Sequence, residues 1–145
     1  MDKNLKAYAS YSIRKADRAR KFYQDVLGLT VKTIPMPNGC NFLEVDIGEE
    51  RFVLYEKEDH VPATFTVMNL EVPDIGLAVK ELRDKGIRFE HYKNSDDLGI
   101  LREEGGPLIA WFRDPDGNFI SVVEEESLAR NFRPRSELDP GQLTS

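Results

Sequence analysis

The stretch WFRDPDGN at residues 111–118, followed by FISVVE at residues 119–124, is the part of the sequence that decides the fold. Asp114, Pro115 and Gly117 stand at the first, second and fourth positions of a tetrapeptide, where a type I turn favours these residue types. Apolar and aromatic residues lie on both sides of the turn. The pattern predicts a β-hairpin with strands at about 108–113 and 118–124.

The residues before this hairpin predict a strand, a helix and a further strand. Residues 64–72 alternate in the manner of a half-buried strand. Pro73 and Asp74 are typical of a helix start, and Gly86 is typical of a helix end. Residues 87–92 predict another short strand.

The first half of the chain follows the same order. Residues 5–13 predict a strand, and an apolar stripe over residues 16–27 predicts a helix that ends at Gly28 in a left-handed cap. Strands are then expected at 30–35, 41–47 and 51–56. The repeat predicts two tandem βαβββ modules of an α+β fold, at about 5–58 and 63–126.

Composition restricts the class of protein. The chain has 145 residues, of which 40% are hydrophobic and 32% charged, as is typical of a globular domain. We expect one domain over residues 1–126 and a polar tail over 127–145. With 20 basic and 26 acidic side chains the net charge is −6, which disfavours nucleic acid and membrane surfaces as partners.

The expected location is the cytoplasm. The first residues lack the apolar segment of a signal peptide, and no apolar run is long enough to span a membrane. Cys40 is the only cysteine, so an internal disulfide is not possible.

Two segments resemble the signatures of the glyoxalase/bleomycin-resistance/dioxygenase (vicinal oxygen chelate) superfamily. They are RKFYQDVLGL at 20–29 and WFRDPDGN at 111–118, and HVPATFTV at 60–67 resembles a bacterial branch of it. The resemblance covers about residues 5–126. It implies paired βαβββ modules that form a half-barrel with a concave ligand cavity, a homodimer, and, in members with activity, a metal in the cavity.

The positions that correspond to the metal ligands of such members do not hold metal-binding residues. By the resemblance they are Tyr8, Val53, Val67 and Ser121. Valine offers no lone pair, and divalent metals bind carboxylate, imidazole or thiolate. Shifting each position by one or two residues in either direction reaches no His, Asp, Glu or Cys. We therefore predict neither a metal nor another cofactor.

Strand alternation predicts which side chains line the cavity instead. If Tyr8 points inward, Ser10 and Ser12 lie beside it, while Tyr11 and Ile13 point toward the helices. The predicted ligand-binding residues are Tyr8, Ser10, Val53, Tyr55, Phe65, Val67, Asn69, Phe119 and Ser121. Such a lining suits a small organic ligand. The alternative is that these side chains fill a small barrel core.

Three other features have two interpretations each. Tight pairing of the hairpin puts Trp111 on the helix side as a core residue, whereas a one-residue bulge would reverse its direction. His60 is read as an ordinary surface histidine, with a general base as the alternative. The irregular stretch Asn94–Pro107 is either a binding loop or a solvated excursion.

The predicted function is that of a metal-free protein that binds an organic ligand in an aromatic-lined cavity. The alternative is a glyoxalase-like lyase or dioxygenase-type enzyme with a relocated metal, and a third possibility is a fold kept for protein contacts. No residue is assigned a catalytic role.

Overall fold

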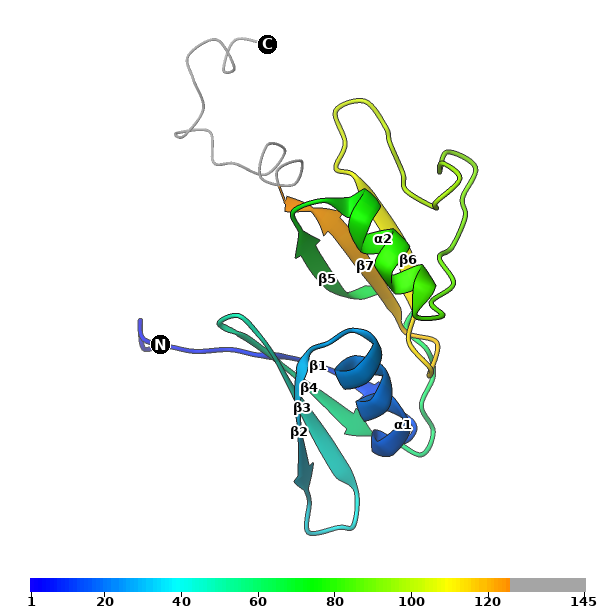
Figure 1. Cartoon of the computed structure of the whole chain (residues 1–145). Helices are drawn as coiled ribbons and strands as arrows, with labels where there is room; N and C mark the ends of the chain where they lie inside the picture. Colours follow the sequence, from blue (N-terminus) through cyan, green and yellow to red (C-terminus); the bar gives the residue numbers. More distant parts are fainter. Residues whose placement is uncertain (126–145) are drawn as a thin grey trace. The chain divides into compact units, whose positions relative to one another are not determined.

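The computed structural model describes residues 1–125, so the tail predicted at 127–145 lies outside the described residues. The elements are β1 (Ala9–Ile13), α1 (Ala16–Arg20), the π-helical η1 (Lys21–Val26), β2 (Thr30–Pro35), β3 (Asn41–Ile47), β4 (Glu50–Glu56), β5 (Thr66–Val72), α2 (Ile75–Asp84), β6 (Ile109–Arg113) and β7 (Phe119–Glu124). The strands form two sheets, β1-β4-β3-β2 and β5-β7-β6 (Figure 1). The predicted α+β fold is confirmed.

The chain divides into two compact units. Among the described residues, unit 1 holds 1–67 and 113–119, and unit 2 holds 68–112 and 120–125. The tip of the hairpin therefore belongs to unit 1, although most of both its strands belongs to unit 2.

Unit 1 is a four-stranded sheet with α1 and η1 on one face (Figure 1). β1 is parallel to β4, and β3 is antiparallel to both β4 and β2. Tyr11 and Ile13 are buried, as alternation predicts, while Ser10 is exposed. Ala16 and Ala19 are buried as well, because small side chains let this short helix lie close to the sheet.

The helix of unit 1 changes geometry before it ends. α1 continues directly into η1, where the stripe in the sequence predicts one regular helix. Gly28 follows with φ +71°, and the Leu29 amide donates to the Tyr23 carbonyl at 3.0 Å. The predicted left-handed cap is confirmed.

Unit 2 is a three-stranded sheet with α2 across one face (Figure 1). Asp74 caps α2, since its side chain accepts from the Leu77 amide at 3.1 Å. The buried apolar residues of the unit are Met68, Ile75, Val79, Ile87, Ile100, Ala110, Ile120, Phe112, Val122 and Val123. None of the described helices has the length and apolar character needed to cross a membrane.

The strand predicted at 87–92 is reduced to one bridge, between Phe89 and Phe112. Glu90 donates its amide to the Trp111 carbonyl at 2.8 Å. A loop lies against this segment, because a Cβ on Gly99 would stand 2.9 Å from the Glu90 carbonyl oxygen. The loop at Gly99 therefore packs directly against this segment.

The hairpin contains a one-residue bulge. The Gly117 amide donates to the Asp114 carbonyl at 3.0 Å, and the Asp114 amide donates to the Asn118 carbonyl at 2.9 Å. This is a type I turn followed by a left-handed residue, Gly117 at φ +86°. At the other end the Glu124 amide donates to the Leu108 carbonyl at 2.9 Å, which keeps the same register.

The bulge decides the direction of Trp111. The register places Trp111 opposite Ser121, one position away from what tight pairing predicts. Phe112 is fully buried and packs on Phe89, whereas Trp111 is half-buried on the other face of the strand. The interpretation of Trp111 as a helix-side core residue is wrong, and the bulge alternative holds.

Substituting Gly117 with alanine is expected to lower the free energy of unfolding by about 2 kcal/mol. A left-handed conformation disfavours alanine, and the new Cβ would lie 3.0 Å from Pro62 Cγ. The matched control is Gly105→Ala, because Gly105 has φ +77° but nothing within 4 Å of its Cβ position. If urea denaturation shows the same loss of unfolding free energy for both variants, the contact with Pro62 contributes nothing to the effect of Gly117→Ala.

Candidate functional site

The predicted ligand-binding residues are divided between the two units. Unit 1 contains Tyr8, Ser10, Val53, Tyr55, Phe65, Val67 and Phe119, and unit 2 contains Asn69 and Ser121. Tyr8 and Phe65 are strongly exposed, at 55% and 69%. Ser121 is buried, and its hydroxyl donates to Asn69 Oδ1 at 2.5 Å. That these residues bind a ligand stays a prediction.

Two of the predicted aromatic residues carry arginine partners. The Arg51 guanidinium lies 4.6 Å from the ring centroid of Tyr8, and that of Arg113 lies 4.6 Å from the Phe119 ring. Such cation–π contacts suit ring faces that water can reach. These rings are therefore surface groups of unit 1 rather than members of its buried core.

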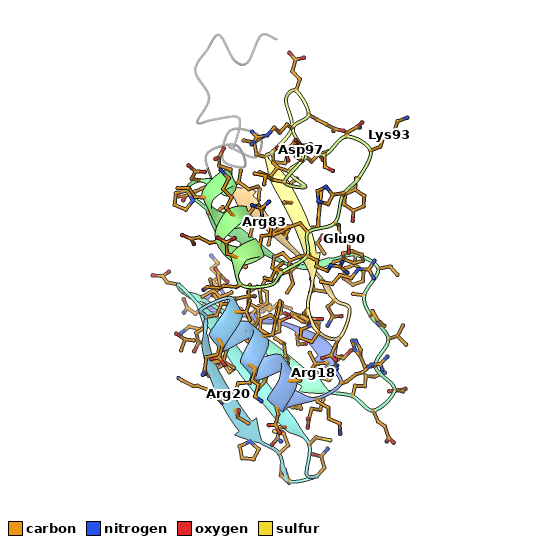
Figure 2. The ribbon with its side chains drawn as sticks, turned by 45° about the vertical axis from the view of Figure 1, so that its right-hand side comes forward. Arg18, Arg20, Arg83, Glu90, Lys93 and Asp97 are labelled. Carbon is orange, nitrogen blue, oxygen red and sulfur yellow. The ribbon has the colours of Figure 1, made fainter. Side chains whose placement is uncertain are left out.

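A pocket of about 500 Å³ lies on unit 2, outside the predicted ligand-binding residues but partly within the stretch Asn94–Pro107, for which a binding loop is one of the two interpretations. Its lining is Tyr92, Lys93, Asn94, Leu101, Glu103 and Trp111. The Tyr92 and Trp111 rings meet edge to face, with centroids 5.5 Å apart and an interplanar angle of 86°. Lys93 extends outward from the loop (Figure 2). We call this the Tyr92–Trp111 pocket.

The loop that forms this pocket is held by its own side chains. The Ser95 hydroxyl donates to the Tyr92 carbonyl at 2.7 Å and accepts from the Tyr92 amide at 2.8 Å. The Asp96 carboxylate accepts from the Ile100 amide at 2.9 Å and from Arg102 Nε at 2.8 Å. Ile100 is fully buried, so it anchors the loop to unit 2.

A second pocket of unit 2, of about 550 Å³, has a mixed lining. It consists of Arg83, Ile87, Arg88, Phe89, Glu90, His91, Asp97 and Leu98. Figure 2 labels three of these charged residues, Arg83, Glu90 and Asp97. Its lining includes side chains of both charge signs, in contrast to the mostly apolar wall of the Tyr92–Trp111 pocket.

A buried polar cluster occupies unit 1 beside the hairpin tip. The Tyr11 hydroxyl donates to the Tyr23 hydroxyl at 2.7 Å, and the Tyr23 hydroxyl donates to Asp114 Oδ2 at 2.8 Å. Asp114 Oδ1 accepts from the amides of Asp116 and Asn118 at 2.9 and 2.8 Å. One carboxylate therefore organises the turn and ties it to η1 and β1.

Burial controls the protonation of this cluster. It raises the pKa of the Asp114 carboxyl above its usual value, although Tyr23 and Asn118 donate hydrogen bonds to it. Burial also raises the pKa values of Tyr11 and Tyr23. Both phenols therefore remain protonated near neutral pH and act as donors.

His60 belongs to the same cluster. It is only 5% exposed, so the interpretation as a surface histidine is wrong. His60 Nε2 donates to the Asp116 carbonyl at 3.0 Å, and Nδ1 lies 2.6 Å from Ser12 Oγ. Arg18 from α1 pairs with the Asp116 carboxylate, and Asn118 Nδ2 donates to the Ser12 carbonyl at 2.9 Å.

Comparison with known proteins settles the family. Residues 7–122 match the family model described as the Glyoxalase/Bleomycin resistance protein/Dioxygenase superfamily. The chain belongs to this superfamily. Among curated proteins, no sequence matches the chain.

Several solved structures share the fold of this chain at low sequence identity. The chain is similar to TnmS3, an antibiotic-binding protein from Streptomyces sp. CB03234 (19% identity, 85% of this chain and 98% of that one, TM-score 0.60). It is also similar to lactoylglutathione lyase from Agrobacterium tumefaciens (19% identity, 83% of this chain and 94% of that one, TM-score 0.62). It is similar as well to the fosfomycin resistance protein FosX from Listeria monocytogenes, with 10% identity over 88% of this chain and 98% of that one and a TM-score of 0.66.

The residues of this chain do not fit the metal that enzymes of the superfamily use. Val53 and Val67 have no donor atom, and the Ser121 hydroxyl is already bonded to Asn69. Tyr8 lies under the Arg51 guanidinium, which disfavours a second cation there. Within residues 1–125, no three His, Cys, Asp or Glu side chains form a group that could hold a metal ion.

Proposed function

We propose that this chain is a metal-free small-molecule-binding protein that holds an organic ligand in the Tyr92–Trp111 pocket. The observation that carries the proposal is an apolar pocket of about 500 Å³ with two aromatic rings in its wall. This volume lies in the range of small-molecule sites, which are mostly apolar with a few polar groups. The antibiotic-binding and resistance proteins of the same fold support the proposal.

The lining indicates the chemistry of the ligand. Tyr92 and Trp111 offer aromatic surface, and Leu101 adds an aliphatic side chain. Lys93 and Glu103 supply one charge of each sign, and Asn94 Nδ2 donates to Glu103 Oε1 at 3.2 Å. A planar aromatic compound with polar substituents satisfies this arrangement, because its rings stack while its substituents reach the charged groups.

Replacing Tyr92 with alanine is expected to weaken binding of such a compound about tenfold, the loss of one aromatic contact. Trp111 is the only tryptophan, so quenching of its fluorescence reports on the pocket directly. We would titrate the protein with a panel of planar aromatic compounds and measure the dissociation constant of each one that quenches.

The control is Leu77→Ala. Leu77 is an exposed apolar side chain of the same unit, 61% exposed against 48% for Tyr92, but it does not line the pocket. Its removal should leave the dissociation constant unchanged. The proposal fails if no compound quenches Trp111 saturably, or if both substitutions weaken binding equally.

Metal analysis separates this proposal from the enzyme alternative. Stoichiometric zinc, nickel, manganese or iron retained after dialysis would contradict a metal-free binding protein. The homodimer implied by the resemblance stays a prediction, to be checked by sedimentation.

A further inference from the structure

The hydrogen bonds of His60 fix where its proton lies. Its Nε2 faces the Asp116 carbonyl at 3.0 Å, and a carbonyl oxygen can only accept. In neutral His60, Nε2 therefore carries the hydrogen, and Nδ1 has a free lone pair. Ser12 Oγ lies 2.6 Å from Nδ1, so the Ser12 hydroxyl donates to this nitrogen. The pair has the arrangement of a nucleophile beside a general base that is oriented by a third group.

Ser12 is less buried than its histidine partner. Ser12 is half-buried, whereas His60 behind it is 5% exposed. Tyr55 is paired with Ser12 in the parallel register and so lies on the same face of the sheet. Phe42 in turn packs on Tyr55, with ring centroids 6.1 Å apart. Two aromatic side chains therefore lie on the same face of the sheet as the hydroxyl.

We infer that Ser12 is a nucleophile activated by His60, and that this face of unit 1 accepts the acyl group of an aryl ester. Ser12 Oγ forms a bond to the ester carbonyl carbon while its proton passes to His60 Nδ1. The bond between that carbon and the phenolic oxygen breaks, and His60 returns the proton to the departing phenolate. The Asp116 carbonyl holds the imidazolium in place through Nε2 during the step. The products are the acyl ester of Ser12 and a free phenol.

The test uses p-nitrophenyl acetate as the ester, with the full chain. We expect release of one equivalent of p-nitrophenol and a mass increase of one acetyl group, which peptide mapping places on Ser12. Ser12→Ala should abolish the label, and His60→Gln should slow labelling roughly 100-fold, the lower end of the range for loss of a general base. Thr33→Ala is the control, because Thr33 carries an exposed hydroxyl on the same sheet that bonds Arg20 and not a histidine. Its labelling should equal that of the unaltered protein.

A second experiment does not require the His60→Gln variant to fold. In a Cys40→Ser background, the thiol of S12C should react with iodoacetamide about tenfold faster than the thiol of S10C, despite its lower exposure, because a neighbouring imidazole increases the thiolate fraction. Acetylation confined to lysines, the amino terminus or Cys40 would overturn the inference. Equal alkylation rates for the two thiols would overturn it as well.

Discussion

Replacing Asp114 with alanine is expected to lower the free energy of unfolding by about 3–5 kcal/mol, because several buried donors lose their acceptor at once. These donors are the Tyr23 hydroxyl, the amides of Asp116 and Asn118, and the Asn118 side-chain amide. None of them can turn toward water, since Asp114, Asp116 and Asn118 are all at most 5% exposed. Urea denaturation followed by circular dichroism measures the loss.

Asp114→Asn is the control that keeps the shape of the side chain. Its oxygen can still accept from the two backbone amides, so the loss should be clearly smaller than for alanine. A turn that depended only on backbone preference would respond equally to both substitutions, and this result would contradict the role of the carboxylate.

The asparagine variant also gives a pH readout. Burial raises the pKa of Asp114 in the folded protein. The stability linked to this raised pKa is fully present below the unfolded value of about 4 and is lost as pH rises through the folded value. The difference in unfolding free energy between the unaltered protein and Asp114→Asn should therefore favour the unaltered protein more at about pH 4 than at about pH 7.

Periodicity predicted most of the fold because each element of this chain has a clear pattern. The strands at 30–35 and 41–47 have the predicted bounds, and Gly28 and Gly86 end the helices as expected. These features depend on neighbours within a few residues. The strand predicted at 87–92 is the exception: it forms one bridge only, and a loop from residues farther along the chain packs against it.

The hairpin shows how a local pattern can be right and its consequence wrong. The residues DPDG predicted the turn, but the pattern did not show that Gly117 forms a bulge. A shift of one residue exchanges the two faces of a strand. Trp111 consequently lines a pocket instead of the core, and the site proposed on it could not be predicted from alternation alone.

The contacts of His60 were beyond sequence reasoning for a different reason. Ser12 and Asp116 are separated from it by 48 and 56 residues. Only the fold of unit 1 brings the three together. A signal was present in the resemblance of residues 60–67 to one branch of the superfamily, but a resemblance does not give the partner of a side chain.

Removing the Arg18 side chain should lower the free energy of unfolding by about 2–3 kcal/mol, because Asp116 would remain buried without its cation. The Asp116 side chain has no exposed surface, and within the described part of the chain its Oδ2 has no hydrogen-bond partner. The estimate is below that for a fully buried pair because the Arg18 side chain is 55% exposed, so solvent screens it. Thermal and urea denaturation of Arg18→Ala would measure it.

Two comparisons distinguish this effect from the loss of a surface side chain. Arg20 lies two positions along the same helix and bonds Thr33 at the surface, so Arg20→Ala should change the unfolding free energy by no more than about 0.5 kcal/mol (Figure 2). In the double variant Arg18→Ala/Asp116→Asn the buried charge is absent, so most of the lost stability should return. If the double variant is instead less stable than Arg18→Ala alone, the unpaired charge is not the cause. The Asp116 side chain would then stabilise the fold by its own contacts, independently of Arg18.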